Sequence, residues 1–215
     1  MQHIIIDTGA SRSFPGPHPL LATGAADGGV VIVIGHKVGE GLACVRDREA
    51  KSAVLLELGT ECLGVYTGES RGTEGSNLLG FARYRLGHAD PTNLIELVRQ
   101  PRTLPQALAA TKAILEGAGF VVAVCGDSPG RIIDRLIRPY FNAALRRLDE
   151  GLADADDMDT TLRLGLGYPE GPIALLERTG LAAHFDVTQS LYEQLGDPAF
   201  APARRARVAK LREQR

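Results

Sequence analysis

Asp127-Ser128-Pro129-Gly130 and Gly165-Leu166-Gly167-Tyr168-Pro169-Glu170-Gly171-Pro172 are two turn sequences that enclose the most regular part of this 215-residue chain. Between them, apolar residues recur at the spacings of three and four that are typical of a helix face: Ile133, Ile137, Tyr140, Ala144 and Leu148. A second apolar stripe follows Ile132, Leu136, Phe141 and Leu145. The two stripes predict a long helix over residues 131–150 that is buried on two sides, as at a domain or subunit junction.

The residues after this helix also favour helices. The acidic run Asp154-Ala155-Asp156-Asp157 suits a helix N-terminus, because carboxylates are stabilised at the positive end of the helix dipole. Further short helices are expected to end at Gly165, Gly180 and Gly196, since glycine commonly stops a helix. We therefore expect residues 127–215 to form an all-α C-terminal domain.

The N-terminal part has a different pattern, in which short apolar runs are bounded by glycine. Such runs are typical of strands buried on both faces, and they occur at residues 4–6, 30–34, 54–56 and 120–124. Residues 63–66 also look like a strand, residues 46–51 like a charged helix, and the glycine-rich residues 35–41 like a surface loop. A helix is expected from Pro105 to Gly117. The sequence thus predicts an α/β domain over residues 1–126, with a parallel or mixed sheet.

Composition narrows the classes of partner. The chain has 24 basic and 26 acidic side chains and a net charge of -2, which offers no field for nucleic acid or for an anionic membrane surface. The cysteines Cys44, Cys62 and Cys125 lie far apart and predict free thiols rather than a metal site. No window approaches the length of a membrane span. We expect a soluble cytoplasmic protein that binds neither nucleic acid nor membrane.

A set of motifs in a defined order, from Leu94 to Pro202, resembles the 3-hydroxyacyl-CoA dehydrogenase family. The motifs are Leu94-Ile95-Glu96-Leu97-Val98, the Asp-Ser-Pro-Gly turn, Arg138-Pro139-Tyr140, Asp157-Met158-Asp159-Thr160, the Gly-Tyr-Pro-x-Gly-Pro block and Leu191-Tyr192. The resemblance implies a Rossmann-like domain that binds NAD. It also implies a helical domain that dimerises and closes over an acyl-CoA thioester.

In such an enzyme a histidine takes the proton from the substrate hydroxyl while a glutamate orients the imidazole. The resemblance places that glutamate at Glu96. The histidine position falls on Tyr84 when counted back from Glu96 and on Ala82 when counted forward from Gly80, and His88 lies four residues beyond Tyr84. An active site that uses Tyr84 or His88 with Glu96 is therefore one hypothesis. The other is that Tyr84 only packs its ring in the sheet and that the proton-transfer pair has been lost.

Asp134 stands where the resemblance implies an asparagine that holds a reacting oxygen. A carboxylate there lacks the donor and adds negative charge where negative charge must develop, so we interpret Asp134 as a surface ion-pair partner of Arg138, one turn along the helix. The catalytic serine has no clear match, although Thr67 and Ser70 lie in the right region. Glu170 replaces an apolar residue in the Gly-Tyr-Pro block, near the expected acyl pocket.

A dinucleotide site normally needs a Gly-x-Gly-x-x-Gly turn directly after the first strand. Here the first strand continues into Asp7-Thr8-Gly9-Ala10-Ser11 and a proline-rich loop, which does not build that turn. Gly39-Glu40-Gly41 together with Glu57 is a weaker likeness. We therefore expect a reduced Rossmann-like domain and leave the cofactor-binding residues unassigned.

The resulting prediction is a family member with impaired or lost NAD-dependent oxidoreduction that retains a CoA-thioester site and forms a homodimer through its helical domain. One alternative is an active dehydrogenase that uses NAD. Another is a non-enzymatic dimeric interaction protein. A remote alternative is an aspartic protease, because Asp7-Thr8-Gly9 resembles the active loop of that class and Leu78-Leu79-Gly80 its bracing segment.

Overall fold

The computed structural model describes residues 2–22, 24 and 29–215. The chain divides into two compact units. The sheet unit comprises residues 1–85 and 91–131, and the helical unit comprises residues 86–90 and 132–215.

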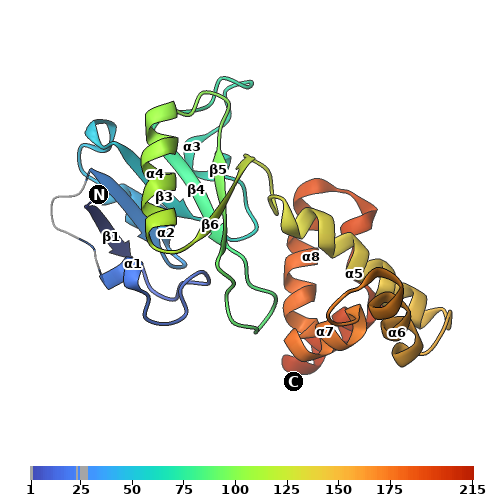
Figure 1. Cartoon of the computed structure of the whole chain (residues 1–215). Coiled ribbons are helices and arrows are strands. Elements are labelled where there is room, and N and C mark those ends of the chain that lie inside the picture. The colour runs from blue at the N-terminus through green and yellow to red at the C-terminus, as the bar shows by residue number, and fades with distance from the viewer. Residues whose placement is uncertain (1, 23, 25–28) are drawn as a thin grey trace. The chain divides into compact units, whose positions relative to one another are not determined.

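The sheet unit contains six strands, and their order in the sheet follows their order in the chain (Figure 1). The strands are β1 (His3–Asp7), β2 (Val30–Ile34), β3 (Ala53–Glu57), β4 (Leu78–Arg83), β5 (Leu94–Arg99) and β6 (Val121–Gly126). All neighbouring pairs are parallel except β4 and β5, which are antiparallel. Every side chain of β2 and β3 is buried, so these central strands are covered on both faces, as the continuous apolar runs predict.

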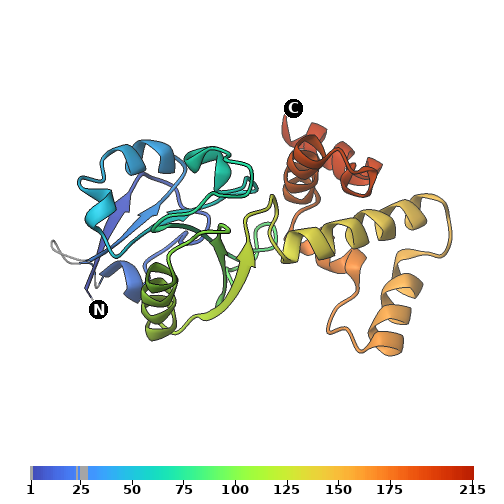
Figure 2. The same ribbon diagram turned by 90° about the horizontal axis from the view of Figure 1, so that it is seen from above.

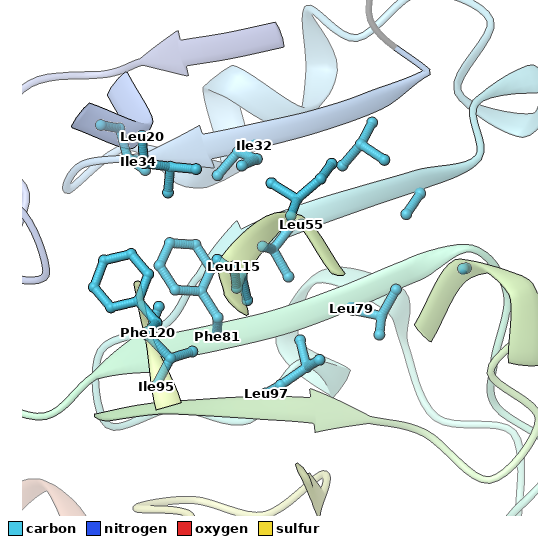
Figure 3. Close-up of a cluster of buried hydrophobic side chains, with 14 of the residues drawn as sticks. Leu20, Ile32, Ile34, Leu55, Leu79, Phe81, Ile95, Leu97, Leu115 and Phe120 are labelled. Carbon is cyan, nitrogen blue, oxygen red and sulfur yellow. The ribbon is translucent and has the colours of Figure 1, made fainter. Parts of the chain in front are cut away.

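Helices cover both faces of this sheet, as the view from above shows (Figure 2). On one face α1 (Pro19–Ala22) and α4 (Pro105–Gly117) pack onto a cluster that includes Ile32, Leu55 and Phe81 (Figure 3). On the other face α2 (Val38–Ala43) and α3 (Gly64–Thr67) pack onto a cluster that includes Val33, Leu56 and Val98. Alternate residues of one strand thus serve opposite cores, which follows from the two-residue period of a strand.

The structure confirms the strands expected near residues 4–6, 30–34, 54–56 and 120–124 and the helix from Pro105 to Gly117. The expectations for residues 46–51 and 63–66 are wrong. Residues 46–51 contain only a short 3-10 helix, Arg48–Ala50, and residues 64–67 form α3 instead of a strand.

The glycine-rich segment after β2 forms α2 rather than a loop. Val38 and Leu42 lie one turn apart and are both buried against the sheet, which stabilises the helix despite its glycines. Gly41 is required for this close approach, because a Cβ atom there would lie 2.5 Å from Cγ1 of Val33.

The helical unit contains the predicted long helix and four further α-helices. They are α5 (Ile133–Asp149), α6 (Ala155–Leu166), α7 (Pro172–Thr179), α8 (Leu181–Leu195) and α9 (Arg204–Glu213), with a 3-10 helix at Pro198–Phe200. Asp154 caps α6 by accepting from the Asp157 amide at 2.8 Å, so the acidic run does begin a helix. None of the helices in the described ranges is long and apolar enough to cross a membrane.

The two apolar stripes of α5 differ in their burial. Phe141 and Leu145 are buried in the unit, whereas Leu136 is 72% exposed and Ile132 is 38% exposed. The second stripe is therefore buried only in its C-terminal half, and its N-terminal half leaves an apolar surface uncovered.

Candidate functional site

Glu96 lies on β5 and is buried in the sheet unit. Its Oε2 atom accepts from Nε of Arg131 at 3.3 Å, and Nη2 of Arg131 donates to the Gly59 carbonyl at 2.7 Å. Arg131 is itself buried and has a left-handed backbone with a φ of 53°. The guanidinium of Arg131 thus pairs with the Glu96 carboxylate, which the family resemblance implies should orient a catalytic imidazole. The sequence pattern did not single out Arg131.

Ala82 is the residue directly opposite Glu96 on the neighbouring strand β4. Opposite residues of an antiparallel pair project from the same face, so the side chain beside Glu96 on β4 is a methyl group. Tyr84 lies two residues further on, where its backbone amide donates to the Leu94 carbonyl and its own carbonyl accepts from the Thr92 amide. Of the two alignments considered, the structure brings Ala82 rather than Tyr84 opposite Glu96, and alanine has no group that exchanges a proton.

His88 lies in the helical unit. The His88 amide donates to the Thr179 carbonyl at 2.8 Å, at the junction of α7 and α8. Its imidazole lies so close to Gly180 that a Cβ atom there would be 2.8 Å from the ring. These contacts fit a packing role for His88 at the start of α8.

Asp134 forms the expected ion pair with Arg138, with Oδ1 and Nε 2.7 Å apart. The expectation that this pair lies at the surface is wrong, because the side chains of Arg138 and Asp134 are 0% and 9% exposed. This part of α5 faces the interior of the helical unit. Asp134 is therefore the counter-ion of a buried arginine.

The pair continues into a buried hydrogen-bond network. Nη1 of Arg138 lies 3.0 Å from Nδ1 of His184, and Nε2 of His184 lies 3.1 Å from Oδ1 of Asn142. Burial, and secondarily the charge of Arg138, lowers the pKa of His184 to about 3. The imidazole is therefore neutral, so it accepts from Arg138 and donates to Asn142.

Thr67 and Ser70, the two positions considered for a catalytic hydroxyl, are held by local contacts. Thr67 Oγ1 accepts from the Gln100 amide group at 2.7 Å, at the end of α3. The Ser70 amide donates to the carboxylate of Glu74 in an exposed loop. The structure thus favours neither residue as a nucleophile or oxygen binder.

The candidate nucleotide residues also have structural partners. Oε1 of Glu57 accepts from Ser11 Oγ at 3.0 Å and from the Ser13 amide at 2.7 Å, and Oε2 accepts from the Gly35 amide at 2.7 Å. Glu57 therefore fastens the loop after β1 to the end of β2, and its carboxylate is occupied by these bonds. Asp7 accepts from the Gly9 amide at 2.9 Å, in a local turn.

The sheet topology gives a second reason why these residues do not fit a dinucleotide. Doubly wound sheets bind dinucleotides at the crevice where the strand order reverses. The order from β1 to β6 contains no reversal within the ranges that the structure describes. The glycine turn and the crevice that would hold NAD are therefore not built by these residues.

The aspartic protease alternative receives no support from the fold. Leu78–Gly80 lies on β4, and two strands, β2 and β3, separate β4 from β1. The segment expected to brace Asp7 is thus distant from it in the sheet.

The helical unit carries an apolar groove of about 770 Å³. Side chains of α5, α7 and the Gly-Tyr-Pro block line it, among them Ile133, Leu136, Ile137, Tyr140, Tyr168 and Leu175. The Tyr140 hydroxyl is buried and has no hydrogen-bond partner among the described residues, and burial raises its pKa. This volume is in the usual range of small-molecule sites.

Glu170 and Asp159 organise the wall of this groove. Glu170 pairs with Arg178, 2.6 Å from Oε2 to Nη2, and this hydrogen bond lowers the pKa of the carboxyl. Asp159 accepts from the amides of Ile173 and Ala174 at 2.9 and 2.8 Å and so caps α7. A Cβ atom at Gly171 would lie 2.2 Å from Asp159, which explains the glycine in this block.

Comparison with known proteins relates the helical half to one family. Residues 130–213 match the family model described as 3-hydroxyacyl-CoA dehydrogenase, C-terminal domain. The chain is 34% identical over 111 residues to mitochondrial hydroxyacyl-coenzyme A dehydrogenase of Sus scrofa. The aligned residues make up 51% of this chain and 35% of that protein. It is 33% identical over 109 residues to 3-hydroxybutyryl-CoA dehydrogenase of Bradyrhizobium diazoefficiens, with 51% and 37% covered. The chain thus matches little more than a third of the length of these relatives.

Solved structures extend the similarity of fold to both units. The 3-hydroxybutyryl-CoA dehydrogenase from Escherichia coli has a TM-score of 0.70 at 21% identity and covers 93% of this chain and 42% of that one. The (S)-3-hydroxybutyryl-CoA dehydrogenase from Ralstonia eutropha has a TM-score of 0.66 at 22% identity, with 83% and 64% covered. These similarities confirm the predicted fold class, a reduced Rossmann-like sheet followed by a helical dehydrogenase domain.

Proposed function

Because the chain belongs with the 3-hydroxyacyl-CoA dehydrogenase family, we propose that it is a member in which NAD-dependent oxidoreduction is impaired or lost and a CoA-thioester site is retained. The observation that carries this proposal is the environment of Glu96, which has Arg131 as its ion-pair partner and Ala82 opposite it.

This environment supports a loss of proton transfer. Oxidation of a hydroxyl group needs a base within hydrogen-bond reach of the proton that leaves. Arg131 forms an ion pair with Glu96, and Ala82, the residue opposite Glu96 on β4, carries no group that exchanges a proton. The loss of such a base typically slows an enzyme by about 10²–10⁴-fold.

Weak binding of the cofactor is the second part of the proposal. NAD would supply the hydride acceptor if it bound, but Glu57 is occupied by backbone amides and the strand order does not reverse. The proposal therefore includes no transfer of hydride to NAD.

The apolar groove on the helical unit supports retained binding of a CoA thioester. Its walls of Ile133, Ile137 and Leu175 suit an acyl chain, and the unpartnered Tyr140 hydroxyl offers one donor to a carbonyl oxygen. In this proposal the chain binds an acyl group and shields it from water without moving a hydride.

Homodimerisation through the helical unit is part of the same proposal. Leu136, Leu164 and Leu166 are 72%, 79% and 63% exposed on α5 and α6, and uncovered apolar side chains of this size commonly mark an interface. This surface is also the observation that favours the second candidate, a non-enzymatic dimeric interaction protein.

Calorimetric titration of the full chain with acetoacetyl-CoA and with NADH tests the proposal. We expect saturable binding of the thioester. When both ligands are present, we expect NADH to be oxidised at less than about 0.01 s⁻¹, whereas typical enzymes turn over at about 1–10³ s⁻¹. Turnover at ordinary enzyme rates would favour an active site with Tyr84 or His88. Failure to bind the thioester would favour the interaction protein.

A matched pair of variants tests whether the thioester binds in the groove. Ile137→Glu puts a charge in the groove wall without changing the exposed leucines of the proposed dimer surface, whereas Leu152→Glu puts one on a leucine that is 69% exposed and outside the groove lining. We expect only the first change to weaken thioester binding, by at least about tenfold, which corresponds to about 1.4 kcal/mol.

A further inference from the structure

β6 is the last strand of the sheet and pairs with β5 alone among the described strands. None of its residues is buried, in contrast to β2 and β3, and Val121 and Val124 are 66% and 38% exposed. An edge strand presents a row of unpaired backbone groups to any other strand that approaches it.

The edge formed by β6 lacks three devices that usually prevent pairing, namely charged residues, proline and a bulge. Its sequence, Val121-Val122-Ala123-Val124-Cys125-Gly126, contains no charged residue and no proline. Folded proteins normally guard such edges with lysine, proline or a bulge. An unguarded apolar edge therefore points to a strand that covers it.

The hydrogen-bond pattern shows which backbone groups are available. The Val121 amide donates to the Asn93 carbonyl, so Val121 faces β5. Because backbone groups alternate along a strand, the N–H and C=O groups of Val122, Val124 and Gly126 point away from β5. None of these three residues makes a further hydrogen bond to a described residue.

We propose that β6 pairs antiparallel with β6 of a second copy of this chain, about a twofold axis at Val124. The three outward residues are spaced symmetrically about Val124, so the axis places Val124 opposite its copy and Val122 opposite Gly126 of the copy. Each of these opposed pairs exchanges two hydrogen bonds in an antiparallel ladder. The strand is thus complementary to itself, and no like charges meet across the axis.

Side-chain packing agrees with this partner. Val122 packs against the core cluster on the α4 face of the sheet, and Val124, two residues along, projects from that same face. Pairing brings the two Val124 side chains together on the face where each is now partly exposed. The result is one continuous sheet through two copies, independent of the groove on the helical unit.

Residue-resolved amide exchange of the full chain tests the proposal. We expect the amides of Val122, Val124 and Gly126 to be protected at high concentration and to lose protection on dilution, while those of Val121, Ala123 and Cys125 stay protected at every concentration. Fast exchange of the first three amides at all concentrations would overturn the proposal.

Two lysine variants separate this interface from general effects on the surface. Val124→Lys places like charges opposite each other at the twofold axis, whereas Val121→Lys adds a charge to a more exposed position of the same strand. Both variants are made in the Leu136→Glu chain, in which the exposed surface of the helical unit carries a charge, and self-association is measured by sedimentation. We expect Val124→Lys to weaken self-association at least tenfold and Val121→Lys to leave it unchanged. If both variants associate with themselves as strongly as the Leu136→Glu chain does, pairing through β6 is contradicted.

Val122→Pro gives an independent check on the hydrogen bonds. Proline removes an amide that faces away from β5, so the sheet within one chain loses no hydrogen bond. We expect the dilute chain to keep its thermal midpoint while association is lost. Unchanged association would again contradict the proposal.

Discussion

Arg131 and Glu96 form an ion pair inside the sheet unit, with Nε and Oε2 3.3 Å apart and both side chains at most 5% exposed. Arg131 adopts a left-handed backbone conformation that costs free energy for a residue with a Cβ atom. The pair therefore gives each charged side chain a buried partner of opposite charge.

Removal of Arg131 should destabilise the chain strongly. Arg131→Met leaves the buried Glu96 carboxylate without a counter-charge, and we expect a loss of about 3–5 kcal/mol in the free energy of unfolding. The measurement is urea unfolding at pH 7. The double variant Arg131→Met with Glu96→Gln should lose less than the single variant, because no unpaired charge remains. A larger loss in the double variant would show that the ion pair does not govern stability here.

The stability of the helical unit should depend on His184 below neutral pH. The folded pKa is about 3 and the unfolded value about 6.5, so protons bind preferentially to the unfolded chain between these values. The contribution of His184 is complete above pH 6.5 and is lost at about 1.4 kcal/mol per pH unit as the pH falls toward 3. Unfolding free energies measured from pH 7 to 4 should fall less steeply in His184→Gln. His36→Gln, at an exposed histidine, is the control and should follow the parent chain. Parallel curves for His184→Gln and the parent chain would refute this assignment.

Asp134→Asn should reduce stability and leave the rate of NADH oxidation unchanged. The amide resembles the residue that the family resemblance implies, but it leaves the guanidinium of Arg138 buried without a counter-ion. We expect a loss of about 3–5 kcal/mol, compared with less than about 1 kcal/mol for Glu40→Ala, which breaks the exposed pair with Lys37. Chemical unfolding and NADH oxidation measured side by side decide the matter. A stable variant with increased turnover would show that Asp134 belongs to a reaction site.

Two glycines of α2 should respond oppositely to alanine. At Gly41 a Cβ atom would collide with Val33, so Gly41→Ala should cost about 1–3 kcal/mol. At Gly39 the nearest atom, on Tyr66, would be 3.7 Å away, so Gly39→Ala should stabilise the helix by about 0.5–1 kcal/mol. Thermal unfolding midpoints measure both effects. The same sign of change in both variants would mean that contact with the sheet does not set the sequence of α2.

Local patterns predicted the elements whose apolar residues follow a regular period. The apolar runs of β2 and β3 identify buried strands, and the helical stripes from Ile133 to Leu148 identify α5. Such patterns are visible in the sequence because a buried face requires apolar residues at the spacing of the strand or helix. The segment that became α2 escaped this reasoning, because its glycines serve contact with β2 and hide the helical period.

The amino-acid sequence by itself determined the division into α/β and all-α parts, the long helix and the family of the helical half. These features depend on periodicity and on motif order, which are properties of the chain read in one dimension. Only the tertiary structure decided the role of each polar group. The pairing of Glu96 with Arg131 and the burial of Asp134 depend on atoms that folding brings together from residues far apart in the chain. The energy of a charge is set by those neighbours and by its distance from water, and neither is encoded in local spacing.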